Sequence, residues 1–245
     1  MSSKIGLNLT KFYSINFDIP KRSRKIIKFI IIHYTGMKKQ SEAIKKLRDF
    51  KSKVSSHYFI KNNGRVLELV PVLYTAWHAG ESSWGKFTSL NKYSIGIEIN
   101  NPGHEHGYKK FSSKQVISLI KLIRYLIKKY KIKKQNILGH SDIAPNRKQD
   151  PGEKFPWNVL AKKNLCKLHY LSKNKIKQYR NLKLNRFEEK IFFNNLFKIG
   201  YIKINNNKTK KNNLVKAFQR KFRQSLINGK TDKECLLISE NVIKS

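Results

Sequence analysis

The stretch IKFIIIHY, residues 27–34, is a short β-branched apolar run that ends in a histidine and a tyrosine. Continuous apolar runs of this length are typical of strands that a central sheet buries on both faces. We therefore predict a central strand here, with His33 at its end.

An amphipathic helix is predicted directly after this strand. SEAIKKLRDFKSK, residues 41–53, has four apolar residues at helical spacing: Ala43, Ile44, Leu47 and Phe50. Such a stripe packs on a sheet. Next, HYFIKNNGRVLELV, residues 57–70, predicts two strands around Asn63-Gly64, a pair suited to the positive φ angles of a tight hairpin turn.

A second strand and a long helix follow. In SIGIEIN, residues 94–100, isoleucines alternate with other residues, so a period of two places Glu98 on the face opposite the isoleucines. SSKQVISLIKLIRYLIKKY, residues 112–130, predicts a surface helix with a capping box at Ser112 and Gln115. The motif NIL then gives a last short strand. The interleaved pattern predicts an α/β fold over residues 1–162, with a mixed central β-sheet flanked by helices.

The composition changes after residue 162. Residues 163–185 carry much charge with weak periodicity and are interpreted as a linker. Residues 186–245 predict a small C-terminal all-α module of three helices, the first ending at Gly200. The helical spacing rests on six apolar residues: Phe192, Leu196, Ile199, Leu214, Phe218 and Phe222.

Between the two parts, GHSDIAPNRKQDPG, residues 139–152, is rich in turn formers. Pro145 and Pro151 interrupt backbone hydrogen bonding, so we expect a loop that positions side chains. A capped turn with solvated charges is the alternative. For Asp142, acceptance of backbone N–H bonds within the loop is the expected role.

Zinc is bound by histidine nitrogens and carboxylate oxygens, and a catalytic zinc keeps three protein ligands and one open position. His33, His140 and Asp150 make such a set, although their spacing matches no helical metal motif. Because most histidines in proteins are structural, the spacing alone leaves both interpretations open.

The chain is strongly basic, with 53 Lys and Arg against 15 Asp and Glu and a formal net charge of +38. Such a surface attracts polyanions, whether nucleic acid, anionic lipid or an acidic cell-wall polymer. An AT-rich coding composition, which favours Lys, Asn and Ile, is an equal explanation. We find no nucleic-acid-binding motif and expect no specific nucleic-acid partner.

Other sequence features bear on the compartment. Cys166 and Cys235 form no disulfide framework or thiolate zinc motif. No apolar run approaches the roughly 18–20 residues of a membrane span. The apolar patch near the N-terminus is far shorter than the roughly 7–15 residues of a signal peptide core. The expected location is the cytoplasm, with the periplasm as the alternative.

Five motifs together resemble a known family. FIIIHYTG, SSHYFIKNNGRVLELV, AWHAG, SIGIEINN and GHSDIAPNRKQDPG have the order and spacing of the zinc-dependent N-acetylmuramoyl-L-alanine amidases of the type 2 family, relatives of the peptidoglycan recognition proteins. The likeness covers roughly residues 25–160. More loosely, the tail is similar to the helical peptidoglycan-binding module that some members carry.

The resemblance implies a zinc ion held by His33, His140 and Asp150, an acidic catalytic residue at Glu98 and a catalytic lysine at Lys148. It also implies hydrolysis of the amide between N-acetylmuramic acid and L-alanine in bacterial peptidoglycan or its turnover fragments, in cell-wall degradation or recycling.

In the family, the AWHAG segment lines the substrate groove, which implies substrate contacts for Trp77 and His78. A buried tryptophan with a satisfied histidine is the alternative for these two. A non-catalytic peptidoglycan-binding protein is the rival function, and the intact ligand positions favour the enzyme. The sequence leaves the oligomeric state open.

Overall fold

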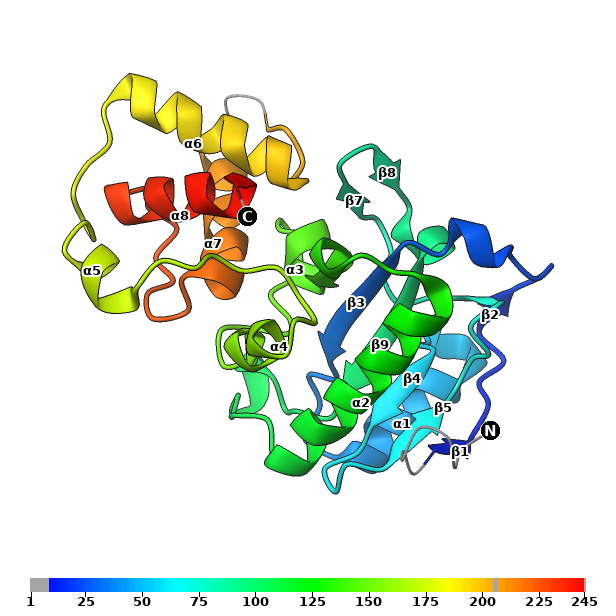
Figure 1. Ribbon diagram of the computed structural model, residues 1–245. Helices are drawn as coiled ribbons and strands as arrows, with labels where there is room; N and C mark the ends of the chain where they lie inside the picture. The colour runs from blue at the N-terminus through cyan, green and yellow to red at the C-terminus, as the bar shows by residue number, and fades with distance from the viewer. Residues whose placement is uncertain (1–8, 205–206, 245) are drawn as a thin grey trace.

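The computed structural model describes residues 9–204 and 207–244. Its centre is a six-stranded mixed sheet with strand order β1-β5-β4-β9-β3-β10 (Figure 1). The strands are β1 (Leu9–Lys11), β3 (Phe29–Tyr34), β4 (Tyr58–Ile60), β5 (Val66–Glu68), β9 (Ser94–Ile99) and β10 (Ile137–Gly139). All neighbouring pairs are parallel except β4 with β5. The predicted α/β fold with a mixed central sheet is confirmed.

Two helices cover the two faces of this sheet. Helix α2 (Ser113–Tyr130) lies in front of the strands in Figure 1 and helix α1 (Gln40–Arg48) lies behind them. The apolar stripe of α2 joins the main core, which also holds Ile30 and Ile97. Helix α1 buries Ala43 and Leu47 in a second cluster with Phe59. Since side chains alternate along a strand, each strand serves both layers.

Shorter elements surround the sheet. Two strand pairs lie outside it: β2 (Phe17–Asp18) with β6 (Thr75–Ala76), and β7 (Ser83–Trp84) with β8 (Phe87–Thr88). Three short α-helices follow β10: α3 (His140–Ile143), α4 (Trp157–Lys162) and α5 (Lys173–Lys177). The 3₁₀ helices span Arg24–Ile26, Phe50–Ser52, Leu90–Tyr93, His104–His106 and Lys134–Asn136.

The three predicted C-terminal helices are confirmed. They are α6 (Arg186–Ile199), α7 (Lys208–Phe222) and α8 (Lys233–Lys244), grouped beside α3 and α4 in Figure 1. Gly200 ends α6 with a φ of 129°, a left-handed conformation in which a side chain would be strained. Five of the six predicted apolar positions are buried, and Ile199 at the end of α6 is partly buried.

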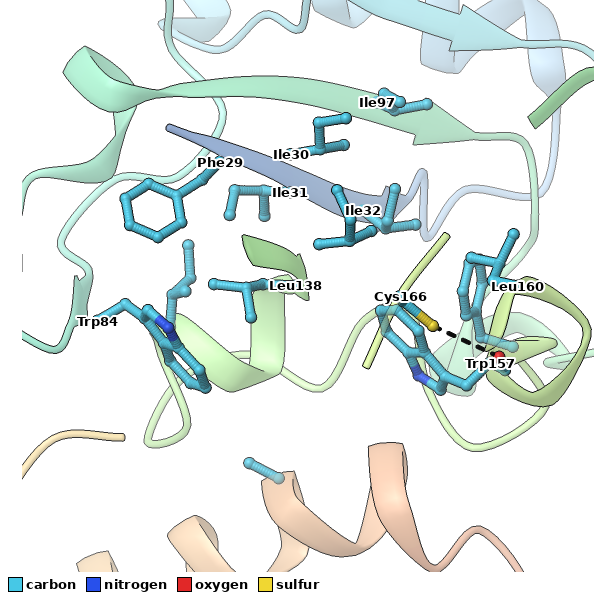
Figure 2. Packing of buried hydrophobic residues seen from close by; sticks show 14 of the residues in the cluster. Phe29, Ile30, Ile31, Ile32, Trp84, Ile97, Leu138, Trp157, Leu160 and Cys166 are labelled. Carbon is cyan, nitrogen blue, oxygen red and sulfur yellow. Dashed lines mark hydrogen bonds between the residues drawn. The ribbon is translucent and has the colours of Figure 1, made fainter. Parts of the chain in front are cut away.

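These helices pack against the sheet domain through large apolar side chains. In Figure 2, Trp84 and Trp157 lie between strand β3 and the orange helix, which is α7. The ring of Trp84 meets that of Tyr201, just after α6, with 4.8 Å between centroids. Cys166 donates a hydrogen bond to the carbonyl of Trp157. Both tryptophans therefore belong to one continuous core that spans the two parts.

Several local predictions were wrong in detail. Phe50 follows the end of α1, in a 3₁₀ turn, and is 53% exposed. The hairpin between β4 and β5 is present, but of its turn pair only Gly64 has a positive φ. Residues 139–152 contain a one-turn helix, α3, where a loop was expected. The first eight residues, on which the export-signal expectation partly rests, lie outside the described chain.

Candidate metal centre and active site

A row of register partners crosses the sheet on the face that α1 covers. It runs from Leu67 through Phe59 and Glu98 to His33. Beside α1 the row is apolar and belongs to the second core cluster. At the carboxyl ends of β9 and β3 it becomes polar. Glu98 and His33 therefore lie side by side at one edge of the sheet. Crevices that bind ligands form at the carboxyl ends of parallel strands, which is where this edge lies.

His33, His140 and Asp150 converge at this edge. The Nδ1 atoms of His33 and His140 are 2.9 Å apart, and each lies 3.1 Å from Oδ2 of Asp150. Two ligand atoms bonded to one tetrahedral zinc ion lie about 3.3 Å apart, from bond lengths near 2.0 Å. The triangle therefore has the donor types and nearly the dimensions that zinc requires.

His140 and Asp150 are ten positions apart, and the chain between them is folded back on itself. We call residues 139–152 the metal loop. The N–H of Ser141 donates to the carbonyl of Asp150, which brings the two ligands together. The carboxylate of Asp142 accepts the N–H of Gly139 at 2.8 Å, as the sequence predicted. The turn-forming residues thus allow the chain to form a closed loop that contains one helical turn.

Hydrogen bonds leave the Nδ1 atoms of both histidines available as ligands. Nε2 of His140 donates to the carbonyl of Ala79. Nε2 of His33 lies 3.0 Å from Nδ1 of His78, and Nε2 of His78 lies 3.3 Å from the hydroxyl of Ser94. The consistent assignment is a chain of N–H donors running outward from His33. Partners of this kind orient metal-binding imidazoles and fix their tautomers.

Gly96 makes room for this chain. A Cβ atom at Gly96 would lie 2.4 Å from Cγ of the His78 ring. The imidazole therefore packs directly on the backbone of the central strand β9. Gly96 lies two residues before Glu98, so both residues belong to the same face of the sheet.

Burial and charge tune the site. Burial, followed by the neighbouring His140, lowers the pKa of His33 to about 4, so the imidazole is neutral at pH 7. Burial raises the pKa of Asp150, but His140 and His33 outweigh it and hold that pKa well below its usual range. For His33 and Asp150, the deprotonated forms that bind a metal are thus the stable forms at neutral pH.

Glu98 has the opposite character. Burial, together with the charge of Asp150, raises the pKa of Glu98 to about 8, although Lys148 and Lys46 act against this. Its Oε2 atom is buried without a hydrogen-bond partner among the described residues. A carboxyl group with a pKa near the working pH is suited to accept and return a proton.

The predicted site residues line one cavity of about 390 Å³. It brings together all seven: His33, Trp77, His78, Glu98, His140, Lys148 and Asp150. Trp77 is partly buried, and its indole N–H donates to the carboxylate of Asp18 at 2.6 Å. His78 is buried, and both of its ring nitrogens have protein partners, which favours the structural alternative for this residue.

Sequence reasoning missed several residues of the same cavity. Arg147 donates to the carbonyls of Ala79 and Glu81, which fastens the metal loop to the segment after His78. His104 receives no role from the sequence. It lies between the hydroxyl of Tyr34, at 2.8 Å, and the carboxylate of Glu153, at 3.1 Å. Only the tertiary fold joins these groups, so no local pattern could have identified them.

Comparison with known proteins agrees with this geometry. A family model described as N-acetylmuramoyl-L-alanine amidase matches residues 22–153. The N-acetylmuramoyl-L-alanine amidase AmiD of Escherichia coli K12 is 34% identical over 231 residues, which cover 89% of this chain and 83% of AmiD. The 1,6-anhydro-N-acetylmuramyl-L-alanine amidase AmpD of Haemophilus influenzae is 38% identical over 109 residues, covering 44% of this chain and 57% of AmpD.

Solved structures give the same result. A complex of E. coli AmiD with the substrate anhydro-N-acetylmuramic acid-L-Ala-D-gamma-Glu-L-Lys has a TM-score of 0.78 and 33% identity, and the match covers 93% of this chain and 91% of that one. AmpDH3 from Pseudomonas aeruginosa, in complex with anhydromuramic pentapeptide, has a TM-score of 0.77 and 27% identity, with coverage of 91% and 93%.

Proposed function

Because the chain belongs to the N-acetylmuramoyl-L-alanine amidase family, we propose that it hydrolyses the amide between N-acetylmuramic acid and L-alanine in muropeptides or peptidoglycan. The observation that carries the proposal is the convergence of His33, His140 and Asp150 in one cavity with Glu98. The two similar structures with bound muropeptides support this substrate class.

In this proposal His33, His140 and Asp150 hold a zinc ion. When bound, zinc would act as a Lewis acid, and in such sites it lowers the pKa of its bound water from about 16 to about 7. The neutral imidazole of His33 and the ionised carboxylate of Asp150 are protonation states that this binding needs. The bonds from His33 to His78 and from His140 to Ala79 keep both Nδ1 atoms aimed at one point.

Glu98 is the proposed proton carrier. Its carboxylate takes the proton of the attacking water, and its raised pKa lets the protonated form persist near neutral pH. The same proton then goes to the leaving amine of L-alanine. Lys148 lines the cavity with Glu98, and its ammonium stabilises the negative charge that develops on the amide oxygen.

The substrate occupies the rest of the cavity. Trp77 offers an apolar ring there, while its indole N–H is held by Asp18. We assign Trp77 to contact with the sugar or the peptide. For His78 we propose orientation of His33 as the main role, because both ring nitrogens are engaged by protein groups.

The test is mass spectrometry of purified muropeptides after incubation with the zinc-loaded chain. We expect free stem peptide and peptide-free sugar, with release slowed about 10²–10⁴-fold in a Glu98→Gln variant. Binding of muropeptides without any release, under every metal condition, would overturn the enzyme and support a recognition protein.

A second contact with the polymer is proposed for helices α6 to α8, supported by their resemblance to peptidoglycan-binding modules. Sedimentation of the chain with insoluble cell wall tests it. Retention above about 200 mM salt is expected for a specific contact, because binding through charge alone is screened. Release of the chain into the supernatant at that salt concentration would assign the binding to its charge.

For the compartment, the proposal is the cytoplasm, with the periplasm as the alternative. Among residues 9–204 and 207–244, no helix combines the length and apolar content needed to cross a membrane. Fractionation of cells that express the chain, followed by immunodetection, decides between the two compartments.

A further inference from the structure

Helix α7 contacts the metal loop and its flanks at several points. Near the start of the loop, Nζ of Lys221 donates to the carbonyl of Ile137 and to the carboxylate of Asp142. Just beyond its end, the side-chain amide of Gln224, two residues after α7, donates to the carbonyls of Glu153 and Phe155 at 2.6 and 2.7 Å. One short segment of the C-terminal part therefore holds both ends of the loop that carries two metal ligands.

The contact at the start of the loop is a buried ion pair. Lys221 and Asp142 are 3.2 Å apart, and their side chains are 4% and 1% exposed. The ammonium also lies 4.8 Å from the ring centroid of Trp157. Because a buried charge without a partner is strongly unfavourable, the carboxylate of Asp142 depends on Lys221.

Asp142 passes this constraint to a metal ligand. Its carboxylate accepts the N–H of Gly139 and the hydroxyl of Tyr201, at 2.8 and 2.7 Å. Gly139 directly precedes His140, and Asp142 follows it by two residues in the same helical turn. The backbone on both sides of His140 is thus tied to one carboxylate, and that carboxylate is tied to the C-terminal part by Lys221 and Tyr201.

The contact at the end of the loop acts on the other ligand. Gln224 holds residues three and five positions after Asp150. Arg220, which lies on α7, has a longer contact of 3.4 Å with the side-chain oxygen of Gln149, the residue before Asp150. Both ligands of the loop are therefore bracketed by groups from α7 and the residues just after it.

We propose that α7 and its following residues position the metal ligands, through Lys221 at His140 and through Gln224 at Asp150. This inference rests on the proposed zinc amidase function. It assigns to the C-terminal part a role inside the catalytic domain, beyond the contact with polymer that the sequence suggests. Lys221 and Gln224 are positioning residues, since they touch the backbone or Asp142 and no metal ligand side chain.

The physical consequence is a change in zinc affinity. A loop released at one end samples arrangements in which the two Nδ1 atoms and Oδ2 of Asp150 are farther apart. Loss of supporting groups around metal ligands typically weakens metal binding about 10–100-fold. Glu98 and His33 belong to the sheet, so their positions do not depend on α7.

The test uses the full chain with Lys221→Met and Gln224→Leu, and Lys210→Met as the matched control on the exposed first turn of α7. The zinc dissociation constant is measured by competition with a chromophoric chelator, at a temperature where circular dichroism shows each metal-free variant to be folded. We expect both test variants to bind zinc about 10-fold more weakly or worse, and the control to match the wild type.

Lys221→Met leaves Asp142 without its cation, so this variant alone can fail to fold. The double variant Lys221→Met/Asp142→Asn removes both charges and so leaves no unpaired buried charge. This double variant and the separate Gln224→Leu variant each test the proposal if Lys221→Met does not fold. Wild-type zinc affinity in the folded variants would overturn the positioning role while leaving the amidase proposal intact. A wild-type chain that binds no zinc would overturn the proposed function and the positioning role with it.

Discussion

His33 and Glu98 are register partners on the adjacent parallel strands β3 and β9. Neighbouring strands lie about 4.8 Å apart, so the sheet itself sets the separation between a metal ligand and the proposed proton carrier. Both residues lie near the carboxyl ends of buried strands, and β3 and β9 each have a neighbouring strand on both sides. The sheet thus sets the positions of these two groups, and the metal loop supplies the remaining ligands.

Replacement of Glu98 by glutamine should remove proton transfer without removing the metal. We expect the rate of stem-peptide release to fall about 10²–10⁴-fold, the usual contribution of a general acid or base. Zinc affinity should stay near that of the wild type. Glu42→Gln, at a largely exposed position on α1, is the control. Full activity in Glu98→Gln would remove this residue from the mechanism.

The raised pKa of Glu98 predicts a pH effect on the stability of the metal-free chain. The folded state holds the Glu98 proton up to a pH of about 8, whereas the ordinary pKa is 4.5. Between these values the folded state binds one proton more than the unfolded state, so the free energy of unfolding falls as the pH rises. The Glu98→Gln variant has no carboxyl group at this position, so this part of the fall in the free energy of unfolding should be absent.

Urea unfolding with chelator present, at pH 5.5 and pH 8, measures this effect. The wild type should lose more stability between the two pH values than Glu98→Gln does. Equal losses in both proteins would show that Glu98 titrates normally in the folded chain.

His78→Phe tests the hydrogen bond that orients His33. Phenylalanine keeps a flat ring against Gly96 but cannot accept the N–H of His33. We expect zinc binding to weaken about 10–100-fold, as for other partners of metal-binding histidines. His106→Phe, at an exposed position, should leave it unchanged. Unaltered zinc affinity in His78→Phe would instead support the substrate-binding role that the resemblance implies.

Gly96→Ala should strain the same packing. The new Cβ would lie 2.4 Å from Cγ of His78, so either the ring or the central strand must move. We expect a loss of about 1–3 kcal/mol in the free energy of unfolding, typical of overpacked cores. In a double-mutant cycle with His78→Ala the losses should not add, because the second change removes the clash. Additive losses would contradict the proposed contact.

Much of the site follows from short-range pattern. The period of two in residues 94–100 separates Glu98 from the isoleucines, and those isoleucines are buried as expected. The apolar run at 27–34 places His33 at the end of a central strand. These inferences succeed because strand alternation is a local property that the sheet only has to preserve.

Other features depend on residues that are distant in the sequence, so no local sequence pattern predicts them. The one-turn helix α3 could not be predicted, because the residues around it are turn formers. The hydrogen bond from Ser141 to Asp150, which closes the loop, joins residues that no local pattern connects. Lys221 is one of 53 basic residues, and only its approach to Asp142 distinguishes it from solvated lysines. Phe50 has helical spacing, but the chain turns before it and leaves it exposed.

The most direct test of the zinc site is a titration. Zinc is added to the metal-free chain while release of stem peptide from a purified muropeptide is followed by mass spectrometry. We predict that activity rises in proportion to zinc, levels off at about one ion per chain as one three-ligand site requires, and stays absent in His140→Ala. Full activity of the metal-free chain, or of His140→Ala at low zinc, would contradict the assignment of His33, His140 and Asp150 as the catalytic metal centre.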